Sequence, residues 1–264
     1  MSRFLKRFYT VLMFLFLYAP IFVLVIFSFN SSKSNANWES FTLDWYIQLF
    51  RDRNIMKALY YTLTVALISS VGATIIGTAA AIGIHQMKAV PKRIMLNINN
   101  LPVLNPDIVT GVAMMTLFQF IRLDLGLLRL LIAHITFNIP YVILSVLPKL
   151  RQMPKNIVEA SLDLGATPFY ALRKVVIPEI LPGIISGALI AFTLSVDDFV
   201  ISFFTTGKGV TNLSIVIFSM AKRGINPKIN ALSALMFTTV LILLLVINIK
   251  DLKSKKTERN STTE

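Results

Sequence analysis

Long apolar stretches constrain this chain more than any other feature of its sequence. Six stretches near 20 residues in length can be drawn, at about residues 8–30, 59–86, 99–121, 127–148, 181–205 and 231–249. About 20 apolar residues in a helix cross the hydrocarbon core of a bilayer, and a helix satisfies its own backbone hydrogen bonds there. The pattern therefore predicts an all-α, polytopic membrane protein with six transmembrane helices in a single domain, residues 1–264.

Composition and charge exclude several other classes. Charged residues make up 15% of the chain, against about 25% in soluble domains. The net charge of +13 could suggest nucleic acid, but the basic residues lie between and beyond the apolar stretches, which indicates membrane lipid as the partner instead. The chain has no cysteine, so disulfides and thiolate metal sites are excluded. No carboxylate lies at ligand spacing from His85 or His134, so we interpret both histidines as structural and predict no metal site.

The distribution of basic residues predicts the orientation. With an even number of spans both termini share one side, and 16 of the 26 basic residues then fall on that side, which indicates the cytoplasm. The apolar run after Arg3, Lys6 and Arg7 is longer than a signal-peptide core and lacks an Ala-x-Ala site, so we expect a signal anchor. On the outer side, residues 31–58 fit either an interfacial helix or an ordinary amphipathic connector.

Small residues recur every four positions in two of the stretches. They are Ala73, Gly77 and Ala81 in the second stretch, and Gly183, Gly187, Ala191 and Ser195 in the fifth. This spacing lets helix backbones approach closely in lipid. We expect packing within the chain for the second stretch, and either internal packing or a subunit seam for the fifth.

The polar segment 149–180 lies between the fourth and fifth stretches. A first short helix is predicted from Asn156 to Leu164, with Gly165 as its left-handed C-terminal cap. A second begins with Thr167 as N-cap and Pro168 at its first position, and Pro178 is expected to end it. The pattern predicts a helix–Gly–helix elbow at the membrane surface.

The order of residues in this elbow resembles the EAA motif of ABC importer permeases. The matching residues are Glu159, Ala160, Gly165, Ala166, Phe169 and Pro178, and the sequence departs from the motif at Ser161, where the family often has a second Ala. The resemblance implies that the elbow is a coupling helix that docks on an ATP-binding subunit. Because no Gly-x-x-x-x-Gly-Lys-Ser/Thr sequence occurs, the chain has no phosphate-binding loop of that kind. We therefore expect no cofactor in this chain, ATP bound by the partner ATPase, and no enzymatic activity of its own.

Three carboxylates fall within the predicted spans, Asp107 in the third and Asp197 and Asp198 in the fifth. A charged residue in a span costs about 2.5–3.5 kcal/mol on insertion scales and usually faces a cavity or a partner. At about 100° per residue, a continuous fifth helix would place Asp198 on the small-residue face and Asp197 about 40° to one side. With Phe199 nearby for cation–π contact, these acids are predicted to line a cation pathway. The alternatives are protonated acids, acids paired with basic residues of a neighbouring subunit and, for Asp107 after Pro106, a cap on a broken helix.

Three further segments resemble the C-type permease of spermidine/putrescine importers. They are residues 105–109, residues 134–137 and Leu194-Ser195-Val196-Asp197-Asp198-Phe199-Val200. The resemblance implies a polyamine importer in the bacterial inner membrane that works by alternating access. Its expected partners are an ATP-binding subunit dimer, a second, different permease subunit, a periplasmic substrate-binding protein and the polyamine substrate. The alternatives are another importer substrate such as ferric iron or thiamine, a gradient-driven cation transporter or channel and, least favoured, an intramembrane enzyme.

Overall fold

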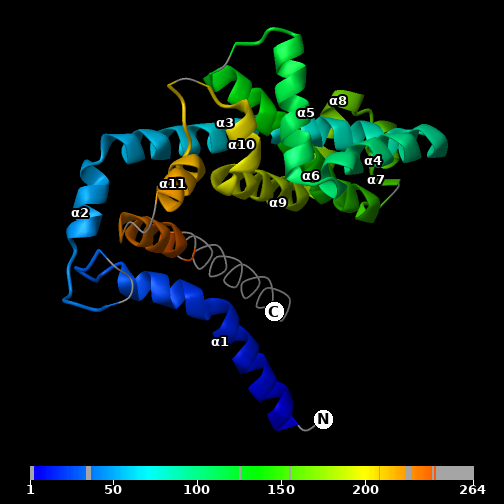
Figure 1. Cartoon of the computed structure of the whole chain (residues 1–264). Coiled ribbons are helices and arrows are strands. Elements are labelled where there is room, and N and C mark those ends of the chain that lie inside the picture. Colours follow the sequence, from blue (N-terminus) through cyan, green and yellow to red (C-terminus); the bar gives the residue numbers. More distant parts are fainter. Residues whose placement is uncertain are drawn as a thin grey trace. The chain divides into compact units, whose positions relative to one another are not determined.

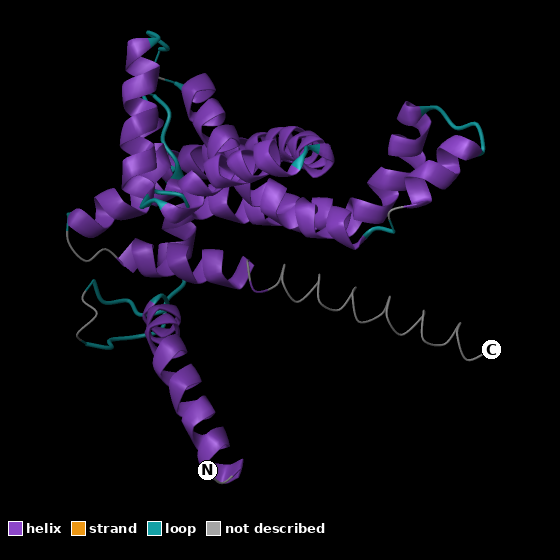
Figure 2. Ribbon diagram, turned by 90° about the vertical axis from the view of Figure 1, so that its right-hand side faces the viewer, coloured by secondary structure: helices purple, strands orange, loops and turns teal. Residues whose placement is uncertain are grey.

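The chain is helical throughout the part that the structure describes. A computed structural model describes residues 3–33, 37–124, 126–154, 156–207, 209–223, 227–239 and 241. Within these residues the regular structure is helical, apart from one isolated bridge between Asn30 and Phe41 (Figure 2). The named elements are α1 (Arg3–Phe27), α2 (Asp44–Arg51), α3 (Arg53–Gln86), α4 (Ala89–Leu104), α5 (Asp107–Phe120), α6 (Leu127–Gln152), α7 (Asn156–Asp163), α8 (Pro168–Ala171), the π-helical turn η1 (Leu172–Val176), α9 (Ile177–Asp197), α10 (Val200–Thr205) and α11 (Leu213–Lys222) (Figure 1). Residues 227–239 are also helical. The all-α prediction is confirmed.

Four of the described helices are long and apolar enough to cross a membrane. They cover Leu5–Phe27, Arg53–Gln86, Leu127–Gln152 and Pro168–Asp197, and α4 with α5 would make a fifth span. These segments contain the second and fourth predicted stretches and most of the first, third and fifth. Of the sixth predicted stretch, 231–249, residues 240 and 242–249 lie outside the described residues.

The third predicted stretch, residues 99–121, is not one straight helix. The axes of α4 and α5 differ by 106° across the break. Pro106 has no N–H to continue the helix, and a residue before proline favours extended backbone, which Asn105 adopts at φ −82° and ψ 147°. The third stretch therefore contains a sharp bend at this proline, which is the broken helix that the sequence left open for Asp107.

The fifth predicted stretch, residues 181–205, is also interrupted. Helix α9 ends at Asp197, Asp198 has an extended ψ of 123°, and α10 begins at Val200. The continuous helix on which the predicted orientation of the two acids depended is therefore wrong, and the bend carries their side chains into different surroundings.

The described residues fall into two compact units. One comprises Met1–Met56 with Ile217–Glu264, and the other comprises Lys57–Val216. In the first, α2 is the amphipathic helix expected within residues 31–58. It is tied to the end of α1 through hydrogen bonds from Trp45 Nε1 to the Asn30 carbonyl (2.7 Å) and between the hydroxyls of Tyr46 and Ser28 (2.6 Å).

Helix α6 forms the centre of the second unit, because α3, α5, α9 and α10 all contribute to the two apolar cores that include its side chains. Gly77 of α3 lies against the Val142 side chain of α6, and Gly187 of α9 lies against Val142 and Ser145 of the same helix. Packing within the chain, predicted for the second stretch, is confirmed. The glycines of the fifth stretch, Gly183 and Gly187, also pack against α6. Of the two alternatives for this stretch, the structure therefore supports internal packing for these glycines over a subunit seam.

Candidate functional site

The elbow predicted between the fourth and fifth stretches is present. Helix α7 covers Asn156–Asp163, and Gly165 follows in left-handed backbone at φ +85°. The Thr167 hydroxyl accepts a hydrogen bond from the Tyr170 N–H (3.3 Å), and Pro168 opens α8. Figure 2 shows these two short helices projecting beyond the long helices that they connect. The predicted caps are confirmed.

Pro178 does not end the second elbow helix, and that prediction is wrong. The chain passes from α8 through the π-helical turn η1 directly into α9, where Pro178 occupies the first turn. The missing N–H of Pro178 would leave an α-helical carbonyl without its donor. In the π-helical turn the Ile177 N–H instead reaches back to the Leu172 carbonyl, which lets the helix continue past the proline. The elbow is thus joined to α9 without a break.

The elbow presents apolar side chains to its surroundings. Leu164 is 90% exposed and Phe169 is 71% exposed, while Glu159 and Ala160 are also exposed. A hollow of about 480 Å³ on one side is lined by Ser161, Leu164, Gly165, Ala166, Thr167 and Tyr170. Exposed apolar side chains gathered around a hollow are typical of a protein-binding surface.

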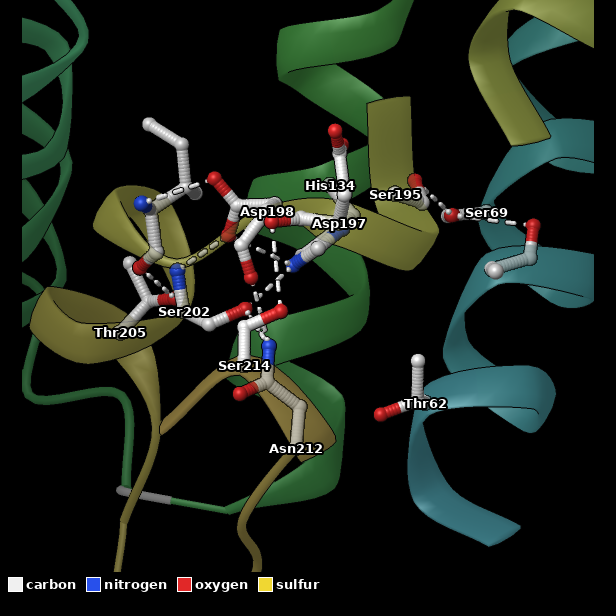
Figure 3. Close-up of polar contacts among 12 residues, drawn as sticks. Thr62, Ser69, His134, Ser195, Asp197, Asp198, Ser202, Thr205, Asn212 and Ser214 are labelled. Carbon is white, nitrogen blue, oxygen red and sulfur yellow. Dashed lines mark hydrogen bonds and ion pairs between the residues drawn. The ribbon is translucent and has the colours of Figure 1, made fainter. Parts of the chain in front are cut away.

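Asp198 stabilises the start of α10 at the break after α9 (Figure 3). Its two carboxylate oxygens accept hydrogen bonds from the N–H groups of Ile201 (3.1 Å) and Ser202 (2.7 Å). His134 Nε2, on α6, lies 3.6 Å from Oδ2 of Asp198 and 3.0 Å from the hydroxyl of Ser202. The Asp198 side chain is 8% exposed. It therefore acts as a buried helix cap held against α6.

Other buried polar side chains complete this network. Asn212 Nδ2 donates to the Asp198 carbonyl (2.8 Å) and to Ser202 Oγ (2.6 Å), which fixes the segment before α11. One helical turn away, Ser195 Oγ accepts from Asn138 Nδ2 (2.7 Å) and shares a hydrogen bond with Ser69 (3.0 Å). Together, these two groups of hydrogen bonds connect α3, α6, α9 and α10. The sequence analysis did not predict these contacts; an inventory of the polar residues within the predicted spans would have included Ser69, Asn138 and Ser202 but not Asn212, which lies outside the spans.

Asp197 has different surroundings, although it is the neighbour of Asp198. Its side chain is exposed, and its backbone carbonyl accepts a hydrogen bond from the Ser214 hydroxyl (3.2 Å). Phe199 is partly buried, with its ring 5.4 Å from the exposed ring of Phe203. Asp197 and Phe199 thus lie at a surface of the unit, beside the cap that Asp198 provides.

Asp107 lies on a different helix from this pair. It is the first residue of α5, exposed and without a side-chain capping hydrogen bond. A negative charge in the first turn of a helix is favourable there because of the helix dipole. The structure therefore places Asp107 at the start of a broken span, and its predicted place on a cation pathway stays a prediction.

The chain resembles known transport proteins over nearly all of its length. The family model described as binding-protein-dependent transport system inner membrane component matches residues 1–252. The chain belongs to this family. Family membership makes it an inner-membrane transport component and not an enzyme, in agreement with the prediction.

Individual relatives and a solved structure agree with this family. The chain is 35% identical to the spermidine/putrescine transport system permease protein PotC of Escherichia coli K12, over 98% of both chains. It is 39% identical to the putrescine transport system permease protein PotI of the same strain, over 86% of this chain and 83% of PotI. Its fold is similar to that of a bacterial ABC transporter involved in alginate import, with a TM-score of 0.72, 17% identity and 92% of both chains covered.

Proposed function

We propose that this chain is the permease subunit through which an ATP-driven importer moves polyamines across the bacterial inner membrane. The observation that carries the proposal is the similarity to PotC, a spermidine/putrescine permease, along 98% of both chains. The similarity to PotI, a putrescine permease, supports the same substrate class. This similarity covers both the elbow and the break between α9 and α10 at Asp197 and Asp198, which we call the acidic break.

In this proposal the chain crosses the membrane six times with both termini in the cytoplasm. The broken pair α4–α5 is one span, and the sixth span is the stretch at about residues 231–249. The chain works with an ATP-binding subunit dimer, a second, different permease subunit and a periplasmic substrate-binding protein. A solved relative of the fold, the alginate importer in complex with its periplasmic protein, supports such an assembly.

The elbow is the proposed docking site for the ATP-binding subunit. Its exposed apolar side chains, Leu164 and Phe169, provide a surface that a groove on a partner would cover. Because α8, η1 and α9 are joined without a break, a movement of the elbow is passed to α9 and hence to the acidic break at its far end. Such a connection suits alternating access.

The two adjacent aspartates have separate proposed roles. Asp197 is exposed and carries the charge that attracts the cationic substrate, with Phe199 beside it. Asp198 is occupied by hydrogen bonds within the chain, so it supports the shape of the break instead of binding substrate.

Uptake measurements test this assignment. The complete importer, reconstituted in vesicles with its binding protein, should take up labelled spermidine or putrescine in the presence of ATP. Asp197→Asn should lower the uptake rate about tenfold or more, because a charge-assisted hydrogen bond contributes about 1.5–3 kcal/mol. Asp44→Asn, which alters an exposed acid of α2, is the matched control and should leave uptake unchanged. Normal uptake by the Asp197 variant would contradict the pathway role, and wild-type uptake of another substrate in place of polyamines would contradict the substrate.

A further inference from the structure

A cleft lies at the end of α6 that is remote from the elbow. It has a volume of about 760 Å³ and is formed by α5, α6, α10 and the loops that follow α5 and α10. The polar side chains that line it are Gln119, Arg122, Asp124, Arg129 and Thr206. The 26 residues of α6 separate this cleft from the elbow by about 39 Å at 1.5 Å per residue. The α5–α6 loop beside it stands at the top of Figure 1.

Arg129 brings a buried positive charge to this cleft. The residue is 2% exposed, and its guanidinium donates one hydrogen bond, from Nη2 to the Met115 carbonyl (3.3 Å). The charge lies 5.3 Å from the centre of the Phe118 ring, while Nε is buried without a hydrogen-bond partner. Among the described residues, no carboxylate lies within 4.0 Å of it. A guanidinium has five N–H donors, so most of the donor capacity of this buried cation is unused.

Arg122 adds a second positive charge from an unusual backbone conformation. It has a φ of +54° directly after α5, where the bonds from Arg122 N–H to the Gln119 carbonyl (3.1 Å) and from Leu123 N–H to the Phe118 carbonyl (2.9 Å) end the helix. Glycine is the usual residue at this position of a helix end because it adopts left-handed backbone without strain. The chain has an exposed arginine there instead, which indicates that the side chain has a use.

The start of α6 adds to the positive potential at this end of the unit. Gly126 precedes the helix and cannot cap it with a side chain, so its first N–H groups carry the positive end of the helix dipole. Asp124 is the acid that lines the cleft, and within the described structure it forms no ion pair with Arg122 or Arg129. The net positive charge of these side chains would repel a polyamine, so the cleft is unsuited to binding the proposed substrate. Its donors suit a carboxylate.

We propose that this cleft binds a carboxylate side chain of the soluble protein that delivers the substrate. The inference rests on the proposed function, in which the elbow is cytoplasmic and the opposite end of α6 faces the periplasm. A docked Asp or Glu side chain would pair with Arg122 at the mouth of the cleft and approach the unused donors of Arg129. Binding would thereby satisfy a buried charge that is unpaired in the isolated chain.

Arg122→Gly is the most informative variant because glycine keeps the left-handed backbone and removes only the charged side chain. The complete importer in nanodiscs would be titrated with the fluorescently labelled, polyamine-loaded binding protein. The Kd should rise about threefold for this exposed contact, and Arg122→Lys should retain part of the affinity. Arg129→Gln should raise the Kd at least tenfold, since removing one member of a buried charge pair is more costly. Arg53→Gln, an exposed arginine outside the cleft, should leave the Kd unchanged.

Two further measurements determine whether the binding protein or the lipid supplies the anion. Acidic residues on the docking face of the binding protein would be reversed one at a time, and one such reversal should restore binding to Arg122→Glu. If the effects of the arginine variants instead disappear when phosphatidylglycerol is replaced by zwitterionic phosphatidylcholine, the anion is the headgroup of an anionic lipid and the inference is wrong. An unchanged Kd for both Arg122→Gly and Arg129→Gln, with normal polyamine uptake by the wild type, would overturn this inference and leave the proposed function intact. Absence of polyamine uptake by the wild type would contradict the proposed function.

Discussion

At the scale of single residues, neighbouring side chains have separate roles because the backbone turns between them. Asp197 ends α9 with an exposed side chain, whereas the carboxylate of Asp198 accepts two N–H groups of α10. His134 and Asn212 hold the same corner from two other segments. The charge of Asp198 is thus used within the chain, and the charge of Asp197 faces outward.

A pair of matched variants separates these roles. Asp198→Asn keeps the size of the side chain but replaces one accepting oxygen with an NH₂ group, so one capping hydrogen bond is lost. We expect a loss of about 1 kcal/mol in stability, measured as a lower midpoint of thermal unfolding in detergent. Asp197→Asn should unfold at the wild-type midpoint, because its side chain caps no helix in the described structure. Equal midpoints for both variants would show that Asp198 is not a structural cap.

At the scale of elements, close helix contacts depend on glycine at particular positions and not at others. A Cβ at Gly77 would lie 2.8 Å from both Cβ and Cγ1 of Val142 on α6, whereas a Cβ at Gly83 would meet nothing within 4 Å. Both glycines belong to α3. The same helix therefore contains a glycine required by packing and one that is not.

Alanine substitutions test this distinction. Gly77→Ala should destabilise the protein by about 1–3 kcal/mol, the usual cost of overpacking a close contact. Gly83→Ala should be neutral or slightly stabilising because alanine favours the helix and meets no obstacle. The residual folded fraction after heating, followed by size-exclusion chromatography in detergent, measures both. A Gly77→Ala protein as heat-stable as Gly83→Ala would mean that α3 and α6 separate easily.

At the scale of the whole molecule, the elbow connects its own exposed surface with the long helices α6 and α9 of the second unit. Gly165 provides the turn between α7 and α8 at φ +85°, and a Cβ there would meet no other atom. Glycine is therefore needed at this position for its left-handed backbone and not because a side chain would lack space. Any effect of substitution should arise from the shape of the elbow.

Two substitutions at this position separate the effect of a strained turn from the effect of any change of residue. Gly165→Ala should strain the turn by about 1–2 kcal/mol and lower the number of substrate molecules imported for each ATP hydrolysed. Gly165→Asn is the control, because asparagine tolerates left-handed backbone, and it should remain close to the wild type. Uptake and phosphate release would be measured on the same vesicles. An uptake-to-hydrolysis ratio that is unchanged in Gly165→Ala would contradict a coupling role for the elbow.

The sequence by itself determined the helical membrane class, the location of the elbow and its caps. These features follow from local rules, since apolar length, a left-handed glycine and a threonine before a proline act within a few residues. The break at Asp198 and the continuation past Pro178 were local details that it missed, whereas a broken helix at Pro106 was among the alternatives it offered. Proline position alone does not say whether a helix ends, bends or continues through a π-helical turn.

Only the tertiary structure decided which polar residues meet. His134, Ser202 and Asn212 are distant in sequence and converge on Asp198 because α6, α10 and the segment before α11 come together at one corner. The same is true of Arg122 and Arg129, which line one cleft although Arg122 lies in the α5–α6 loop and Arg129 lies on α6. Apolar patterning specifies which segments are buried, but the partner of a buried charge depends on contacts between segments that no local rule contains.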